Sequence, residues 1–196
     1  MRIIAATQNA HKLVEIRAIT DHFGFELVSQ AEAGLADLDV EETGTTFEDN
    51  SFIKADAICK ATGEPAIADD SGLAVDILGG APGVYSARFA GEHGNDAANR
   101  AKLLEELKDV PEGQRGAKFV CVITLVFPDG RKLVSRGECP GKIGFEEKGE
   151  HGFGYDSLFI PEGLEQTFAE VDAEVKNSMS HRARALANLK PMLEKL

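Results

Sequence analysis

Residues 65–90 read PAIADDSGLAVDILGGAPGVYSARFA, and two aspartates, Asp69 and Asp70, stand between two apolar runs. The first run predicts a buried strand that ends at the aspartates, and the run after Ser71 predicts another strand. Adjacent carboxylates repel one another unless positive charge lies near them. At the carboxyl end of a strand in an α/β sheet, the pair predicts a Mg²⁺ site. An ordinary turn is the alternative, because aspartate before Ser-Gly is typical of turns.

The hydrophobic pattern on both sides of this segment alternates between strands and helices. Polar caps, such as Asn9, Thr46 and Asn95, precede the helical patterns, and glycine or proline follows them. The chain therefore predicts a mixed α/β domain without an internal boundary. The expected strands are 2–6, 25–28, 65–68, 72–77, 118–127, 131–138 and 158–160, and the expected helices are 9–24, 46–62, 95–107 and 178 onward.

Composition limits the classes of function. The 196 residues include 21 basic and 33 acidic side chains, a net charge of −12, which argues against the broad basic face of a nucleic-acid-binding protein. No run approaches the roughly 18 apolar residues of a membrane helix, and the apolar run near residue 1 is too short for a signal peptide. The cysteines, Cys59, Cys121 and Cys139, are three and widely spaced. We therefore expect reduced thiols and a cytoplasmic protein without membrane or nucleic-acid partners.

Three further segments carry candidate chemistry. Residues 7–12, TQNAHK, follow a strand and open a helix, where backbone N–H groups can bind phosphate. In residues 152–156, GFGYD, an aromatic ring between two glycines could stack on a base. A basic cluster lies at residues 176–182, and Lys54 lies one helical turn after Asn50. The alternatives are a capped helix, a tight turn with a core phenylalanine, and solvated surface charge. No histidine pair has the H-x-x-x-H spacing of a zinc site.

Six motifs follow one another between Thr7 and Arg182: T-x-N-x-x-K, E-E-T-G-x-T-F-x-x-N, A-I-A-D-D-S-G-L, G-G-A-P-G-V-Y-S-A-R, F-G-Y-D and S-H-R. In this order they resemble the inosine triphosphate pyrophosphatase family, which acts on deaminated purine nucleotides. The resemblance extends over essentially the whole chain. It implies an elongated, mixed, twisted β-sheet flanked by helices, with two lobes and a central cleft, in one nucleoside triphosphate pyrophosphatase domain of residues 1–196.

The resemblance also implies an activity. Such an enzyme hydrolyses ITP, dITP and XTP to the monophosphate and pyrophosphate, with Mg²⁺, as a homodimer. Asp70 matches the general base and, with Glu41, the metal positions, while Asp69 and Lys54 complete the catalytic set. Which of Asp69 and Asp70 is the base and which binds metal stays open, because direct metal binding weakens a carboxylate as a base. The matched substrate-binding positions are Thr7, Gln8, Asn9, Ala10, His11, Lys12, Ser71, Phe153, Gly154, Tyr155, Asp156, Lys176, His181 and Arg182.

Base selectivity has a physical explanation within this resemblance. Hypoxanthine and xanthine present an acceptor at O6, where adenine presents an amino donor. Hydrogen-bond donors of His181 and Arg182 would be paired by the O6 of hypoxanthine or xanthine, and adenine would leave them unpaired. Two other functions compete with this hypothesis: a nucleotide-binding sensor without catalysis, and a septum-formation-inhibitor type of pyrophosphatase that acts on other modified nucleotides. The carboxylates argue against the first, and the F-G-Y-D and S-H-R segments against the second.

Overall fold

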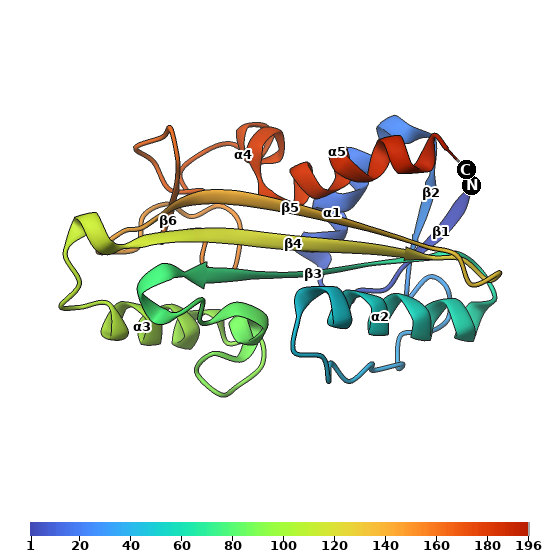
Figure 1. Ribbon diagram of the computed structural model, residues 1–196, viewed down its shortest axis with the longest axis horizontal. Helices are drawn as coiled ribbons and strands as arrows, with labels where there is room; N and C mark the ends of the chain where they lie inside the picture. Colours follow the sequence, from blue (N-terminus) through green and yellow to red (C-terminus); the bar gives the residue numbers. More distant parts are fainter. Residues whose placement is uncertain (196) are drawn as a thin grey trace. The chain divides into compact units, whose positions relative to one another are not determined.

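The computed structural model describes residues 1–195, with only the backbone at residue 19, and in them a six-stranded sheet has the order β2-β1-β3-β4-β5-β6 (Figure 1). Strand β1 pairs in parallel with β2 and β3, whereas β5 and β6 pair antiparallel, so the sheet is mixed, as expected. The strands are β1 (Arg2–Ala5), β2 (Glu26–Ser29), β3 (Ala66–Val75), β4 (Gly116–Val126), β5 (Lys132–Ile143) and β6 (Phe159–Pro161). The helices are α1 (Ala10–Thr20), α2 (Phe47–Thr62), α3 (Asp96–Glu106), α4 (Ala173–Met179) and α5 (His181–Leu193), and 3-10 turns cover Asp21–Phe23, Asp76–Leu78, Gly83–Arg88 and Glu112–Gln114.

The predicted helix caps are confirmed. The Asn9 side chain accepts the backbone N–H groups of His11 and Lys12 at the start of α1. Thr46 accepts the N–H of Asp49 at the start of α2, and Asn95 caps α3 in the same way. Each cap satisfies N–H groups that have no partner inside the helix, so the local sequence determines where these helices begin.

Several predicted boundaries were wrong: the strand expected at 131–138, for example, continues to Ile143 as β5. Two of the errors concern candidate site residues. The strands expected at 65–68 and 72–77 are one strand, β3, so the two aspartates lie inside a strand and not at its end. The charges are tolerated there because cationic side chains reach both of them, which the apolar pattern could not indicate. The helix expected from residue 178 is two helices, α4 and α5, because Ser180 between them has extended backbone (φ −64°, ψ 159°).

The chain forms two compact units. The first unit comprises Met1–Asp70, Cys121–Gly137 and the residues from Arg182 on, and the second comprises Ser71–Val120 and Glu138–His181. In the first unit, alternate residues of β1 face different layers, as the period of two in a strand requires. Ile3 packs in a cluster with residues of α1 and α5, whereas Ile4 packs in a cluster with residues of α2. Figure 1 accordingly shows α1 and α5 on one side of these strands and α2 on the other.

The second unit has its own apolar core, to which α3, the strands and the loop after residue 152 contribute. It includes Leu103 and Leu107 at the end of α3, Tyr155 and the mutually packed rings of Phe119, Phe159 and Phe168.

Across residues 1–195 no helix combines the length and the apolar character that crossing a membrane requires. Cys59, Cys121 and Cys139 are all buried, and no disulfide joins them in the described part of the chain.

Candidate active site

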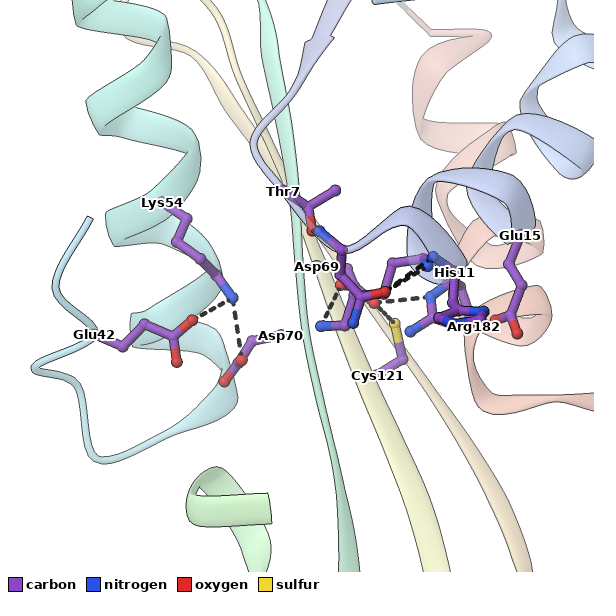
Figure 2. Close-up of polar contacts among 11 residues, drawn as sticks. Thr7, His11, Glu15, Glu42, Lys54, Asp69, Asp70, Cys121 and Arg182 are labelled. Carbon is purple, nitrogen blue, oxygen red and sulfur yellow. Dashed lines mark hydrogen bonds and ion pairs between the residues drawn. The ribbon is translucent and has the colours of Figure 1, made fainter. Parts of the chain in front are cut away.

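Asp69 lies on the side of β3 that faces α1 and α5. Lys12 Nζ of α1 lies 2.8 Å from Asp69 Oδ1. Arg182 Nε of α5 donates to Asp69 Oδ2 at 2.8 Å (Figure 2). The Cys121 thiol also donates to Oδ2, at 3.5 Å. The side chain of Asp69 has no exposed surface. Two cations therefore hold this carboxylate in a fixed position.

Asp70 lies on the other side of the strand, toward α2. Lys54 Nζ is 3.2 Å from Asp70 Oδ1 and 2.8 Å from Glu42 Oε1, so the ammonium bridges two carboxylates (Figure 2). Asp70 Oδ2 is buried and has no hydrogen-bond partner among residues 1–195. A buried carboxylate oxygen without a partner is costly, and it is suited to bind a water molecule or a cation.

The two aspartates differ in proton affinity. Burial alone raises the pKa of Asp69, but Arg182 and Lys12 outweigh it and hold the pKa of this carboxyl well below its usual range. Burial also raises the pKa of Asp70, and here Lys54 and Lys12 offset only part of the effect, so the pKa stays raised. A carboxylate with a raised pKa is the better proton acceptor. Asp70 is therefore suited to be the base and Asp69 to be a structural anion.

Lys54 remains a cation in this environment. Burial lowers the pKa of its ammonium group, but Asp70 and Glu42 outweigh burial and raise it. Asn50, one turn earlier on α2, accepts the backbone N–H of Gly44 at 2.8 Å through Oδ1. A Cβ on Gly44 would lie 2.6 Å from that oxygen, so glycine is required for the close approach. This contact holds the loop that carries Glu42 against α2.

Arg182 is fully buried and serves two carboxylates. Besides Asp69, its guanidinium bonds to Glu15, which lies one turn after Lys12 on α1 (Figure 2). Burial lowers the pKa of Arg182, but Asp69 and Glu15 outweigh it and raise the pKa, so the charge is permanent. The sequence predicts that Arg182 binds the substrate base. The structure adds an anchoring role through Asp69, and base binding stays a prediction.

Residues 7–12 form the turn from β1 into α1. Thr7 Oγ1 accepts the N–H of Asn9, and Asn9 Oδ1 accepts the N–H groups of His11 and Lys12. Gln8 donates to the carbonyl of Ala36 at 3.0 Å. Residues 8–11 are exposed. The Asn9 cap therefore occupies the N–H groups of His11 and Lys12, two of the backbone donors that were predicted to bind phosphate. The Lys12 side chain supplies the positive charge of this turn.

In the second unit, three predicted residues form one contact group. Asp156 Oδ2 accepts the backbone N–H of Phe153 at 3.0 Å and a hydrogen bond from Lys176 Nζ at 2.8 Å. The same ammonium lies 4.9 Å from the centre of the Phe153 ring. The Lys176 and Asp156 side chains are only 6% and 5% exposed, so their ion pair is buried. It holds the half-buried Phe153 in the tight turn between Gly152 and Gly154, both of which have positive φ.

Three more predicted residues belong to the second unit: His181, Ser71 and Tyr155. The His181 ring is buried and stacks on Phe119, with centroids 4.8 Å apart and an interplanar angle of 15°. Ser71 is half-buried in β3. Tyr155 donates its hydroxyl to the carbonyl of Ser86 at 2.7 Å, and burial raises the pKa of that phenol.

The sequence did not single out Glu42 or Glu15. Glu42 contacts Lys54, whereas Glu41, the predicted metal ligand, is exposed. The signal was the adjacent pair at 41–42, which does not indicate which carboxylate faces inward. Glu15 had no signal, because a glutamate on a helix is usually solvated and its partner Arg182 lies 167 residues away.

The donor set fits a magnesium ion. In residues 1–195 no cluster of three or more histidine, cysteine, aspartate or glutamate side chains forms a complete cage. Mg²⁺ does not need one, because it usually binds one or two carboxylates and completes its shell with water and substrate phosphate. The unpartnered Oδ2 of Asp70 offers one such hard oxygen ligand.

Known proteins resemble the chain over its full length. A model of the Ham1 family matches residues 3–192. The dITP/XTP pyrophosphatase of Haemophilus influenzae is 51% identical over 194 residues, 98% of each chain. A HAM1 protein from Coxiella burnetii, 39% identical and covered over 100% of both chains, has a TM-score of 0.89, and the Staphylococcus aureus Ham1 protein, 41% identical over 100% of this chain and 99% of that one, has a TM-score of 0.88. The family that the six motifs predicted is thereby confirmed, and the chain belongs to the Ham1 family.

Proposed function

We propose that this protein hydrolyses deaminated purine nucleoside triphosphates, dITP, ITP and XTP, to the monophosphate and pyrophosphate. The observation that carries the proposal is the pair Asp70 and Lys54, a carboxylate with a buried, unpartnered oxygen beside a buried cation. Hydrolysis of an anhydride needs a base for water and positive charge for the phosphates. Relatives about 50% identical carry the name dITP/XTP pyrophosphatase, which supports the substrate class.

Asp70 is the proposed base. Its Oδ2 accepts a proton from the attacking water, and Lys54 keeps the carboxylate oriented through Oδ1. Asp69 stays ionised because Arg182 and Lys12 bind it, and it keeps those two cations in place. Lys12, 17% exposed at the start of α1, is the proposed contact to the phosphates, together with the rest of residues 7–12.

Asp70 and Glu41 are the proposed residues of a Mg²⁺ site, and Asp70 would hold the ion through a bound water molecule, because direct binding would weaken it as a base. When bound, the ion neutralises charge on the phosphate oxygens and on the departing pyrophosphate. Glu42 keeps Lys54 in place beside Asp70. In the second unit, Phe153 is the proposed stacking surface for the base, held by Asp156 and Lys176, and His181 is a proposed donor to O6. Arg182 is also a proposed donor to O6, in addition to its contact with Asp69.

The remaining features of the proposal come from the family resemblance. We propose that residues 1–196 form one nucleoside triphosphate pyrophosphatase domain with Ser71 among its substrate contacts. The protein would act as a homodimer on the nucleotide pool of the cytoplasm. Light scattering coupled to size-exclusion chromatography tests the dimer, and a mass of 21.0 kDa in solution would refute it.

Release of pyrophosphate from dITP, ITP, XTP, GTP and ATP with Mg²⁺ tests the function. We expect the first three substrates to have a kcat/KM at least about 10²-fold higher than ATP, because an unpaired buried donor is costly. Equal rates on all five would refute the substrate class. Hydrolysis in ¹⁸O-water distinguishes the reaction type, since attack at the α-phosphorus puts the label in the monophosphate. Label in orthophosphate, with a diphosphate as co-product, would indicate a γ-phosphatase instead.

A further inference from the structure

Helix α3 holds the turn at residues 152–156 through the backbone of Gly154. The Asp96 carboxylate accepts the Gly154 N–H at 2.9 Å, and Arg100 Nη1 donates to the Gly154 carbonyl at 2.9 Å. Asp96 and Arg100 are one helical turn apart on α3, so their side chains extend from the same face. Both backbone groups of one glycine are therefore bound by charged side chains.

These two contacts are charge-assisted, and further hydrogen bonds hold Arg100 and α3 in place. Arg100 also pairs with Glu147 through Nε, which fixes the plane of the guanidinium. Asn95 caps α3 at the residue before Asp96, and Asn99 binds backbone groups of Ala87 and Ala90. The helix that carries Asp96 and Arg100 is thus anchored to the segment that precedes it in the chain.

Gly154 is a sensitive position for such an anchor. Its φ of +60° lies in the left-handed region, and it follows Phe153 directly. Phe153 is held on its other side by Asp156, and Tyr155 by the carbonyl of Ser86. The Asp96 and Arg100 contacts tie the backbone of Gly154 to α3, so their loss would free the centre of the turn to move, and the Phe153 ring with it.

We propose that Asp96 and Arg100 are positioning residues, which hold Gly154 so that the Phe153 ring keeps the orientation that binds the nucleobase. This inference rests on the proposed function, because it assigns the loop a nucleobase as its ligand. Asp96 and Arg100 act through the loop backbone. Their loss should weaken contacts that depend on the base and spare contacts that depend on phosphate alone.

The test uses Asp96→Ala, Asp96→Asn, Arg100→Ala and a matched control on the same helix, Glu106→Ala. Glu106 is also a carboxylate of α3, but its ion pair is with Lys102, at 3.8 Å. Two quantities are measured for each variant of the full chain. The first is amide hydrogen exchange of a peptide that covers residues 152–156. The second is the pair of inhibition constants for IMP, which has a base, and for inorganic pyrophosphate, which has none.

We expect Asp96→Ala and Arg100→Ala to speed exchange in residues 152–156 and to weaken IMP on the order of tenfold, the size expected for a lost charge-assisted hydrogen bond. Pyrophosphate inhibition should stay within about twofold, below the size of any such loss. Asp96→Asn should recover most of the IMP affinity, because its amide oxygen can accept the same N–H. Glu106→Ala should behave like the parent in both measurements.

Three outcomes would overturn the inference: unchanged exchange in the alanine variants, unchanged IMP inhibition despite faster exchange, or equal loss for IMP and pyrophosphate, which would indicate general damage. A failure of the proposed function looks different. If the proposed function is wrong, the parent protein neither hydrolyses dITP nor is inhibited by IMP. In that case the role of Asp96 and Arg100 in base binding is refuted too, whatever the exchange rates show. A parent active on dITP whose alanine variants bind IMP normally refutes only the positioning role.

Discussion

Asp69 and Asp70 are consecutive in β3, yet their carboxylates have different cationic partners on different helices. Asp69 Oδ1 lies 2.8 Å from Lys12 Nζ on α1, and Asp70 Oδ1 lies 3.2 Å from Lys54 Nζ on α2. Successive side chains of a strand point to opposite faces of the sheet. The strand therefore separates two charges that would repel one another in a turn, and it gives them different cationic partners.

Asp70→Asn should abolish turnover without destabilising the protein. We expect kcat to fall by about 10²-fold or more, the usual contribution of a general base. Because the pKa of Asp70 is raised in the folded protein, ionisation of Asp70 favours the unfolded state. Without Mg²⁺ at pH 7 the variant should therefore melt at the same temperature as the parent or higher. This difference should disappear below about pH 4, where the parent carboxyl is protonated. Turnover within a few-fold of the parent would contradict the assignment.

Asp69→Asn should have the opposite effect on stability. The folded protein lowers the pKa of Asp69, so the ionised carboxylate stabilises the fold above its unfolded pKa, and this stabilisation is lost as the pH falls through the folded pKa. Removing the charge leaves Arg182 buried with one partner fewer. At pH 7 urea denaturation should show a loss of about 3 kcal/mol or more, the usual cost of breaking a buried ion pair. A variant as stable as Asp70→Asn would refute this division of roles.

The adjacent glutamates should differ in phenotype. Glu42→Gln removes a carboxylate from Lys54, so kcat should fall while the Mg²⁺ concentration for half-maximal activity changes little. Glu41→Gln should instead raise that Mg²⁺ concentration, as its predicted role as a metal ligand requires. Magnesium titrations of the two isosteric variants decide the matter. The reverse pattern would make Glu42 the metal ligand and Glu41 an exposed loop residue.

Phe153→Ala should weaken substrate binding by about 1–3 kcal/mol, the usual worth of stacking between a base and an aromatic ring. The effect should be on KM for dITP and much less on kcat. Phe145→Ala is the matched control, since Phe145 is an exposed ring of the same unit that lies on Arg115. An unchanged KM in a folded Phe153→Ala variant would make Phe153 a packing residue.

His181→Ala and Arg182→Ala test the recognition of O6 by these two residues. If His181 donates to O6, its loss should lower kcat/KM for ITP far more than for ATP, so the ratio of the two falls. Arg182→Ala removes the partner of Asp69 and Glu15, so stability and the activity on both nucleotides should fall. If Arg182 also binds the base, the ratio of ITP to ATP activity should fall as well. Parallel assays on ITP and ATP measure both ratios. A preserved ratio in either variant would refute recognition of O6 by that residue.

The sequence by itself determined the features that depend on near neighbours. Asn9, Thr46 and Asn95 cap the helices that they were predicted to cap, because a cap is a contact over two or three residues. The class of fold and the family also followed from local patterns and from the order of the motifs. Each cap and each motif consists of residues close together in the sequence, so no tertiary contact is needed to identify it.

Tertiary structure alone decided that β3 continues through its charged centre and which cation serves which aspartate. It also decided that Glu42, not Glu41, contacts Lys54, and that Glu15 shares Arg182 with Asp69. The partners in these ion pairs lie between 12 and 167 residues apart in the numbering, and each pair exists only because packed elements hold it together. A buried charge is stable only with its partner in place, and no local pattern in the sequence specifies that partner.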